Sequence, residues 1–146
     1  MIMAEVKIIN GEVFSDNRGS INSLNNFTYD GVRRSYFITH PDTETVRGWN
    51  AHWKERKWFC CLKGEFKLAL VKLDSWDNPS EGLSPEVYTL NSSEMQLVAV
   101  PGGYASAMQA TVPDSVLMVL SDTPFPPESE DSQKFPLTLW SEWLKK

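Results

Sequence analysis

Residues 46–64 read VRGWNAHWKERKWFCCLKG. The Val, Trp, Phe and Cys content of this stretch favours strands over helices. Similar short apolar segments recur between turn residues along the chain, at Glu5–Val13, Arg33–Thr39, Lys57–Leu62, Phe66–Leu73, Glu86–Leu90, Met95–Val100, Ala105–Ala110 and Ser115–Leu120. Many short strands at regular spacing predict an all-β sandwich or barrel, with any ligand pocket built around residues 46–64.

The remaining segments are consistent with one domain over residues 1–146. The length and the 41% hydrophobic content suit a single core. Asp122–Lys134, rich in prolines and acidic residues, predicts a solvated loop. Leu137–Leu144 predicts a short terminal helix or a final strand.

Composition limits the classes of partner and the location. No long apolar run or leader-like segment is present, which predicts a soluble cytoplasmic protein with no membrane partner. The net charge is −5 with scattered Lys and Arg, so no nucleic-acid surface is expected, although a few focused arginines suffice for a small anion. Cys60 and Cys61 are adjacent and would point to opposite faces of a strand, which predicts reduced, structural thiols.

Two segments hold the residues best suited to chemistry. One is Arg47–His52 (RGWNAH), followed by Glu55 and Gly64, and the other is Pro101–Ser106 (PGGYAS). This layout resembles the two motifs of the cupins, which have a double-stranded β-helix (jelly-roll barrel) fold. Metal-binding cupins carry three histidines and one carboxylate there. The resemblance places Asn50 and the final serine of the second motif at two of the histidine positions.

A metal site is therefore not expected. Only His52 and Glu55 remain as ligands, and a stable site needs three or four protein ligands. No other cofactor is expected either. The second histidine of the chain, His40, precedes Pro41 in a predicted turn, and we expect it to be exposed.

A narrower resemblance covers nearly the whole chain. Phe14–Gly19 (FSDNRG) is similar to an F-x-D-x-R-G motif, Val46–Asn50 to L-R-G-L-H, and Val100–Ser106 to I-P-x-G-F-A-H, while Pro127–Glu130 and Trp140 resemble the C-terminal end. These motifs, in this order, are those of the cupin-type dTDP-4-dehydrorhamnose 3,5-epimerase and dTDP-sugar 3,4-ketoisomerase (WxcM-like) family. Its members act on dTDP-4-keto-6-deoxy sugars.

The resemblance implies roles for individual residues. Arg18 and Arg47 match arginines that hold the nucleotide diphosphate or shape the sugar site, for which a guanidinium offers a planar fork of donors. Lys57 matches a lysine that stabilises an enolate oxygen. Tyr104, on a loop near the pocket mouth, would stack on a base or sugar. The alternatives are that Arg18 is a surface turn residue and that Lys57 is solvated.

The departures from the family pattern concern the proton-transfer groups. The epimerases use the histidine of R-G-x-H as base, and here that position is Asn50, an amide without useful basicity. The strand that carries their acid, here residues 115–120, has no tyrosine. The chain is thus identified as a divergent member lacking the usual catalytic histidines, and double epimerisation by the usual route is not expected.

The ketoisomerase branch offers a second pair of groups. Its members carry R-G-x-H-A-H and a tyrosine on the preceding strand, and here His52 keeps the second histidine position while residues 34–37 (RSYF) resemble R-x-Y-Y. His52 as base and Tyr36 as partner would shuttle protons between neighbouring sugar carbons. The alternative for His52 is an interior histidine paired with Glu55 or with a backbone group.

Three functions follow. The first is an isomerase on a dTDP-4-keto-6-deoxy sugar with His52, Tyr36 and Lys57 as catalytic residues, and with substrate-binding residues Arg18, Arg47, Asn50, Tyr104 and Ser106. The second is a catalytically silent cupin that binds a sugar nucleotide or a partner protein. A metal-dependent oxygenase or decarboxylase is disfavoured for want of ligands. The resemblance also implies a homodimer that exchanges N-terminal strands, and a role in surface polysaccharide synthesis.

Overall fold

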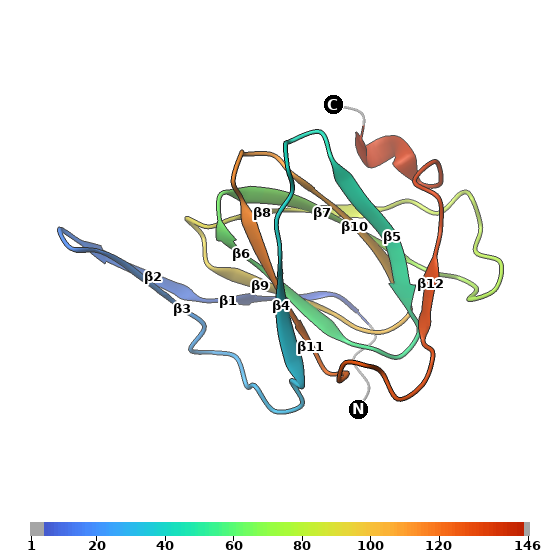
Figure 1. Ribbon diagram of the computed structural model, residues 1–146, viewed down its shortest axis with the longest axis horizontal. Helices are drawn as coiled ribbons and strands as arrows, with labels where there is room; N and C mark the ends of the chain where they lie inside the picture. The colour runs from blue at the N-terminus through green and yellow to red at the C-terminus, as the bar shows by residue number, and fades with distance from the viewer. Residues whose placement is uncertain (1–4, 145–146) are drawn as a thin grey trace.

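Two five-stranded antiparallel sheets face each other in the computed structural model, which describes residues 5–144 (Figure 1). The first sheet has the order β1 (Lys7–Asn10), β9 (Gln96–Val100), β6 (Lys57–Lys63), β11 (Val116–Ser121) and β4 (Arg34–Ile38). The second has the order β12 (Ser132–Lys134), β5 (Val46–His52), β10 (Tyr104–Ala110), β7 (Glu65–Lys72) and β8 (Glu86–Asn91). The all-β prediction is confirmed.

The space between the sheets is filled at one end by apolar side chains. Successive residues of a strand point to opposite faces, so every second residue enters this interior. The main cluster takes its side chains from β6 to β11, among them Phe59, Phe66, Leu68, Leu70, Val98, Leu117 and Val119. The cluster leaves room between β4, β5, β6 and β10, and this gap positions the site described below.

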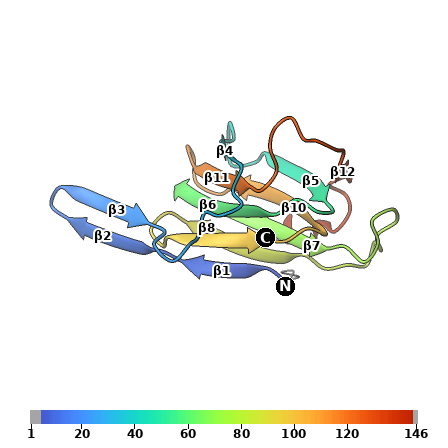
Figure 2. The same cartoon turned by 90° about the horizontal axis from the view of Figure 1, so that it is seen from below.

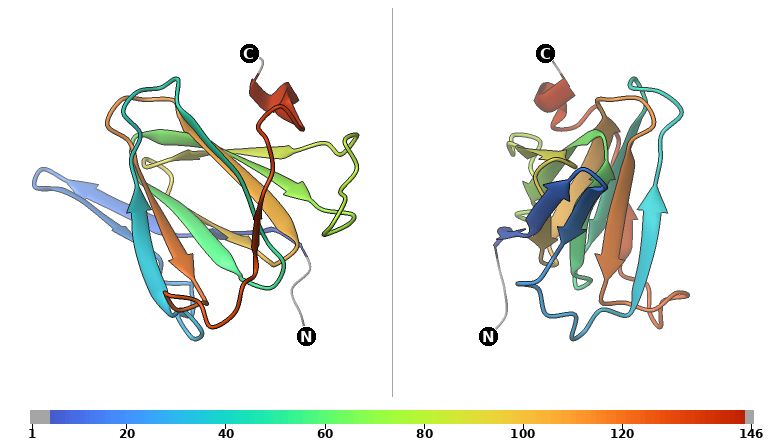
Figure 3. Two further views of the ribbon diagram at one scale, coloured as in Figure 1. Left: turned by 45° about the vertical axis from the view of Figure 1, so that its right-hand side comes forward. Right: turned by 90° about the vertical axis from the view of Figure 1, so that its left-hand side faces the viewer.

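The outer face of the second sheet is covered by the C-terminal segment, which runs along the outside of β5 (Figure 3). Trp49 is fully buried there, donates Nε1–H to the Leu139 carbonyl at 2.9 Å, and packs against Trp140 and Trp143. The chain then ends in a 3-10 helix, Ser141–Leu144. Of the two alternatives for Leu137–Leu144, a short helix or a final strand, the structure has a single 3-10 turn, and Trp143 from this turn packs against Trp49 of β5.

A two-stranded hairpin, β2 (Glu12–Asp16) and β3 (Gly19–Ser23), projects away from the two sheets (Figure 2). Its apolar side chains Val13, Phe14 and Ile21 are 42%, 59% and 66% exposed. The sequence predicts one continuous strand over Glu5–Val13, and this is wrong. The chain leaves the sheet at Gly11, where a Cβ would lie 2.2 Å from the Ser23 carbonyl oxygen.

Two further expectations need correction. The predicted loop over Asp122–Lys134 ends in strand β12, because Ser132–Lys134 pairs with β5 and extends the second sheet. His40 is not exposed, since its ring packs edge-on against Phe66 and both ring nitrogens are buried. Strand β12 forms because it pairs with a distant segment, and His40 is covered because the loop before β5 packs against the interior.

The two cysteines lie where the sequence predicts. Cys60 packs in the cluster on the outer face of the first sheet, and Cys61 packs in the interior cluster. Both are buried free thiols. Burial raises the pKa of each thiol to about 11, so neither is a reactive thiolate at neutral pH. Within the described part of the chain, no helix is long and apolar enough to cross a bilayer.

Candidate active site

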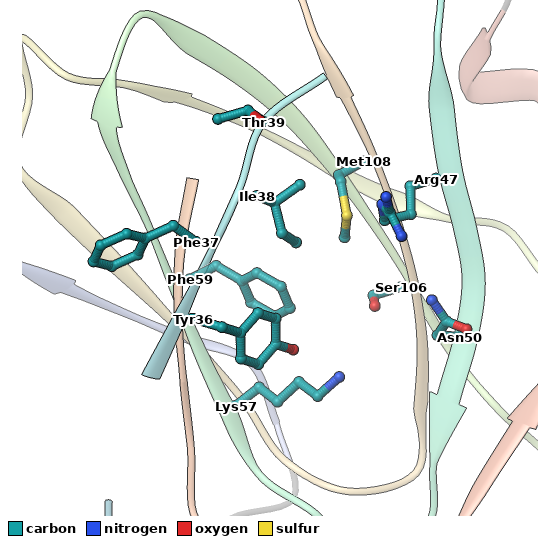
Figure 4. A pocket seen from close by; sticks show the side chains of 10 residues that line it. All are labelled: Tyr36, Phe37, Ile38, Thr39, Arg47, Asn50, Lys57, Phe59, Ser106 and Met108. Carbon is teal, nitrogen blue, oxygen red and sulfur yellow. The ribbon is translucent and has the colours of Figure 1, made fainter. Parts of the chain in front are cut away.

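A cavity of about 460 Å³ opens between the sheets, and side chains from four strands point into it (Figure 4). It is lined by Tyr36, Phe37, Ile38 and Thr39 from β4 and the loop after it, by Arg47 and Asn50 from β5, by Lys57 and Phe59 from β6, and by Ser106 and Met108 from β10. Apolar side chains from β4, β6 and β10 thus line the cavity together with hydroxyl, amide, ammonium and guanidinium groups. A mixed lining of this kind is typical of a site for a polar organic ligand.

A bulge in β5 brings Arg47 and Asn50 to the same side. Gly48 pairs with Ala107 and Asn50 pairs with Ser106, so Trp49 has no partner in the ladder. Without the extra residue, positions 47 and 50 would face opposite sides of the sheet. Gly48 has φ 147°, and a Cβ there would lie 2.4 Å from the Ala107 Cβ. Only glycine fits this position.

The polar side chains of the cavity have no hydrogen-bond partner among the described residues. Within residues 5–144, the side chains of Tyr36, Arg47, Asn50, Lys57 and Ser106 make no hydrogen bond and no salt bridge. Their polar atoms are not among the fully buried, unpartnered atoms of this part of the chain, so solvent or a ligand can reach them. Five polar groups that converge on one open cavity are suited to a polar organic ligand.

A narrow extension leads from the cavity past Asn50, Lys57 and Ser106 to His52, Glu55 and Tyr104. Here His52 Nε2 lies 3.3 Å from Glu55 Oε1, with the histidine side chain 20% exposed and the carboxylate 6% exposed. Ser121 donates its hydroxyl to the other carboxylate oxygen of Glu55. The expected pairing of His52 with Glu55 is thus present, at the end of the extension rather than in the cavity itself.

Two aspartates hold the turn between β5 and β6 that carries Glu55. The Asp131 carboxylate accepts the backbone N–H groups of Trp53, Lys54 and Glu55 at 2.9–3.1 Å. Asp122 accepts from the backbone N–H and Nε of Arg56, both at 3.0 Å. Both aspartates lie in the predicted loop Asp122–Lys134, which therefore orders the turn below the site. No local sequence pattern predicts this function, since the backbone N–H partners of a loop carboxylate lie far away along the chain.

Burial and neighbouring charges shift the pKa values of the site groups. Burial lowers the pKa of Lys57, with the Arg34 guanidinium acting in the same direction, while Glu55 and Asp131 oppose it. Burial raises the pKa of the Tyr36 phenol. The pKa of His52 is lowered, first by burial and then by the charge of Lys57, with Glu55 opposing. The three shifts favour a neutral phenol and a neutral imidazole, and they ease deprotonation of the ammonium.

The two remaining predicted site residues do not line the main cavity, although Tyr104 lines its extension. Arg18 lies at the tip of the projecting hairpin, with its side chain 82% exposed and paired with Asp16 at 2.6 Å, and it does not line the cavity. Tyr104 is wrongly placed by the sequence analysis on a loop at the pocket mouth. It begins β10 and is only 7% exposed, because its ring belongs to the interior cluster.

Arg34 was quoted in the sequence analysis only as part of a motif. Its guanidinium lies over the Tyr36 ring, 4.6 Å from the centroid, and over Phe125, and its Nε donates to the Thr123 carbonyl at 3.2 Å. This cation–π contact holds the Tyr36 ring in place. The period-two spacing of Arg34 and Tyr36 is the signal that places them on one face of β4.

No group of three or more His, Cys, Asp or Glu side chains within residues 5–144 has the geometry of a metal site. His52 and Glu55 face each other and Ser121, and the positions that cupin metal sites fill with histidine are occupied by Asn50 and Ser106, which lie opposite each other on β5 and β10. The residues present do not fit a resident metal ion.

We expect Glu55→Gln to lower the pKa of His52 further, because the negative charge of Glu55 raises this pKa in the wild type. The chain has only two histidines, so the ring resonances of His52 can be followed by NMR during a pH titration, with His40 as internal reference. Glu94→Gln, on an exposed turn, is the matched control. An unchanged His52 titration in Glu55→Gln would show that the pair is not electrostatically coupled.

The comparisons with known proteins agree with this geometry. The model of the FdtA family, described as WxcM-like, C-terminal, matches residues 4–138. The chain belongs to this family. No curated protein sequence matches significantly.

Solved structures similar to this WxcM-like chain share its fold. A histidine-to-asparagine mutant of the 3,4-ketoisomerase QdtA from Thermoanaerobacterium thermosaccharolyticum, in complex with TDP-4-keto-6-deoxyglucose, is 21% identical, with a TM-score of 0.72 over 97% of this chain and 95% of that one. A 3,4-ketoisomerase from Helicobacter canadensis is 17% identical, with a TM-score of 0.69 over 95% and 97%.

A sugar epimerase is also among the similar solved structures. NovW, a 4-keto-6-deoxy sugar epimerase from Streptomyces spheroides, is 18% identical, with a TM-score of 0.73 over 90% of this chain and 70% of that one. The predicted jelly-roll cupin fold and the predicted family are confirmed.

Proposed function

We propose that this protein is an isomerase that acts on a nucleotide-linked 4-keto-6-deoxy sugar and moves protons between the ketone carbon and its neighbour. The observation that carries the proposal is the convergence on one cavity of five polar side chains that have no hydrogen-bond partner within residues 5–144, namely Tyr36, Arg47, Asn50, Lys57 and Ser106. Membership of the WxcM-like family and the ligands named for the QdtA structures support the substrate class.

Each group at the cavity suits one part of such a ligand. Arg47 has a free guanidinium at the exposed end of the site, where it would take a diphosphate oxygen pair. Asn50 and Ser106 lie opposite each other and offer hydrogen bonds to sugar hydroxyl groups. Lys57 from β6 and Tyr36 from β4 both point into the cavity (Figure 4), where a developing enolate oxygen would meet a cation and a phenol. His52 would exchange protons with this pair through the extension.

Arg18 enters the proposal through a homodimer. Its hairpin leaves the body of the protomer with Val13, Phe14 and Ile21 exposed, and apolar strands of this kind are suited to burial against a second copy. Exchange of the N-terminal strands would carry Arg18 towards a partner's cavity. A cytoplasmic location and a role in polysaccharide synthesis complete the proposal.

The test is hydrogen exchange in heavy water. The protein is incubated with dTDP-4-keto-6-deoxyglucose, and deuterium at the carbons next to the ketone is followed by NMR, together with formation of the 3-keto isomer. We expect exchange above the buffer rate. Binding without any exchange would contradict the isomerase and leave the catalytically silent cupin as the function.

Binding is measured separately by thermal shift with dTDP. We expect a stabilisation that Arg47→Ala abolishes, because this guanidinium is the cation at the open end of the cavity. Arg33→Ala is the matched control, since Arg33 is exposed outside the main cavity. An equal shift in wild type and Arg47→Ala would contradict the placement of the diphosphate.

A further inference from the structure

We infer that Lys57, rather than His52, removes the carbon-bound proton of the substrate and returns it to the neighbouring carbon. This inference rests on the proposed function and assigns a role to each of its residues. Lys57 acts as a general base and then as a general acid, in addition to stabilising the enolate.

The first argument is the composition of the cavity wall. Three titratable side chains line the main cavity, and these are Tyr36, Arg47 and Lys57. An arginine keeps its proton at any pH that a protein survives. Asn50 and Ser106, which occupy the facing wall, have no useful basicity. Lys57 is therefore the one amine base that lines the main cavity as the described residues define it.

The second argument is the surroundings of Lys57. Its Nζ points into the cavity (Figure 4), and within the described residues no carboxylate lies within 4 Å of it. The groups that act on it electrostatically are Glu55 and Asp131 on one side and Arg34 on the other, and it acts in turn on His52. Glu55 is occupied by His52 and Ser121, and Asp131 by three backbone N–H groups. A half-buried ammonium without its own counter-ion gives up its proton more easily than one in water.

The third argument is the place of His52. It lines the extension, together with Asn50 and Lys57, and is not among the side chains that line the main cavity. Its Nε2 faces the Glu55 carboxylate. Lys57 lines both spaces, so the lysine is the one of the two groups that a sugar in the main cavity would contact.

The reaction then balances with residues of this chain alone. Neutral Lys57 takes the proton from the hydroxyl-bearing carbon, the C–H electron pair forms the C=C bond, and the carbonyl electrons move to the ketone oxygen. Tyr36 gives its proton to that oxygen and takes the proton of the neighbouring hydroxyl. The new Lys57 ammonium returns its proton to the former ketone carbon, and the second oxygen becomes the ketone.

The decisive variant is Lys57→Arg, which keeps a positive charge but cannot act as a base near neutral pH. We expect carbon exchange in heavy water to fall by about 100-fold or more, with dTDP binding retained. Lys63→Arg, exposed at the far end of β6, is the matched control and keeps the full exchange rate. Exchange close to wild type in Lys57→Arg would overturn the inference, while no exchange in the wild type would overturn the proposed function itself.

A second variant guards against misfit of the larger arginine. In Lys57→Ala, added ethylamine should restore exchange in proportion to its unprotonated form, whereas tetramethylammonium, a cation without a proton to exchange, should restore none. Equal rescue by both cations would show a purely electrostatic role and overturn the inference.

The wild-type pH profile gives another readout. A rate that is already flat above pH 6.5, the ordinary pKa of histidine, would assign proton removal to His52.

Discussion

Replacing Gly48 by alanine is expected to lower the free energy of unfolding by about 3 kcal/mol or more. Gly48 has φ 147°, which a side chain opposes, and its Cβ would lie 2.4 Å from the Cβ and 2.7 Å from the Cα of Ala107. Both strands are held on two sides, β5 by β10 and β12, and β10 by β5 and β7, so neither can move aside freely.

The measurement is thermal or urea unfolding of wild type and Gly48→Ala, where we expect a drop in melting temperature on the order of 10 °C. Gly82→Ala is the matched control, because an added Cβ there meets its nearest atom at 3.6 Å and Gly82 is exposed. A melting temperature for Gly48→Ala equal to that of Gly82→Ala would show that the bulge tolerates a side chain. The proposed alignment of Arg47 and Asn50 would then need another cause.

Tyr36→Phe is expected to reduce isomerisation by about 100-fold, the lower range for loss of one positioned acid or base. The phenol hydroxyl makes no hydrogen bond to any described side chain or backbone group, and it points into the cavity that Lys57 also lines. Burial raises its pKa, so it enters the reaction as a proton donor. Its removal should cost almost no stability, since no protein partner is left unsatisfied.

The measurement combines turnover of dTDP-4-keto-6-deoxyglucose with the melting temperature. Tyr88→Phe is the control, because the Tyr88 hydroxyl is bonded to Glu86 at 3.1 Å on the surface. We expect full turnover in the control and a normal melting temperature in both variants. Turnover of Tyr36→Phe at the wild-type rate would exclude the phenol as the group that moves protons between the two oxygens.

The sequence alone determined the short, strongly apolar strands and the family of the chain. The segments over residues 57–62, 66–73 and 105–110 became β6, β7 and β10 with bounds displaced by one residue or so, because short runs of apolar and small residues suit strands that are buried on both faces. The segments that it missed, Gly19–Ser23 and Ser132–Lys134, are polar strands without alternation. Their pairing with β2 and β5 defines them, and no local pattern shows it.

For the site, the sequence supplied the residue types and the tertiary structure decided which of them meet. Arg47 and Asn50 are three positions apart and would face opposite sides of a regular strand, yet the bulge at Gly48 and Trp49 turns both into the cavity. Lys57 follows them on the next strand and faces the same space. Arg18 carries an equally clear motif but lies on the projecting hairpin, remote from the cavity of its own protomer.

The stretch VRGWNAHWKERKWFCCLKG thus determined that a strand pair with an arginine, an amide, an imidazole and an amine would stand in the site. Only the tertiary structure placed the amine in the main cavity and the imidazole in the extension against Glu55. The physical reason is that side-chain direction depends on the register with β10 and β12. Glu55 in turn is positioned from far along the chain, because Asp131 accepts its backbone N–H and Ser121 donates to its carboxylate.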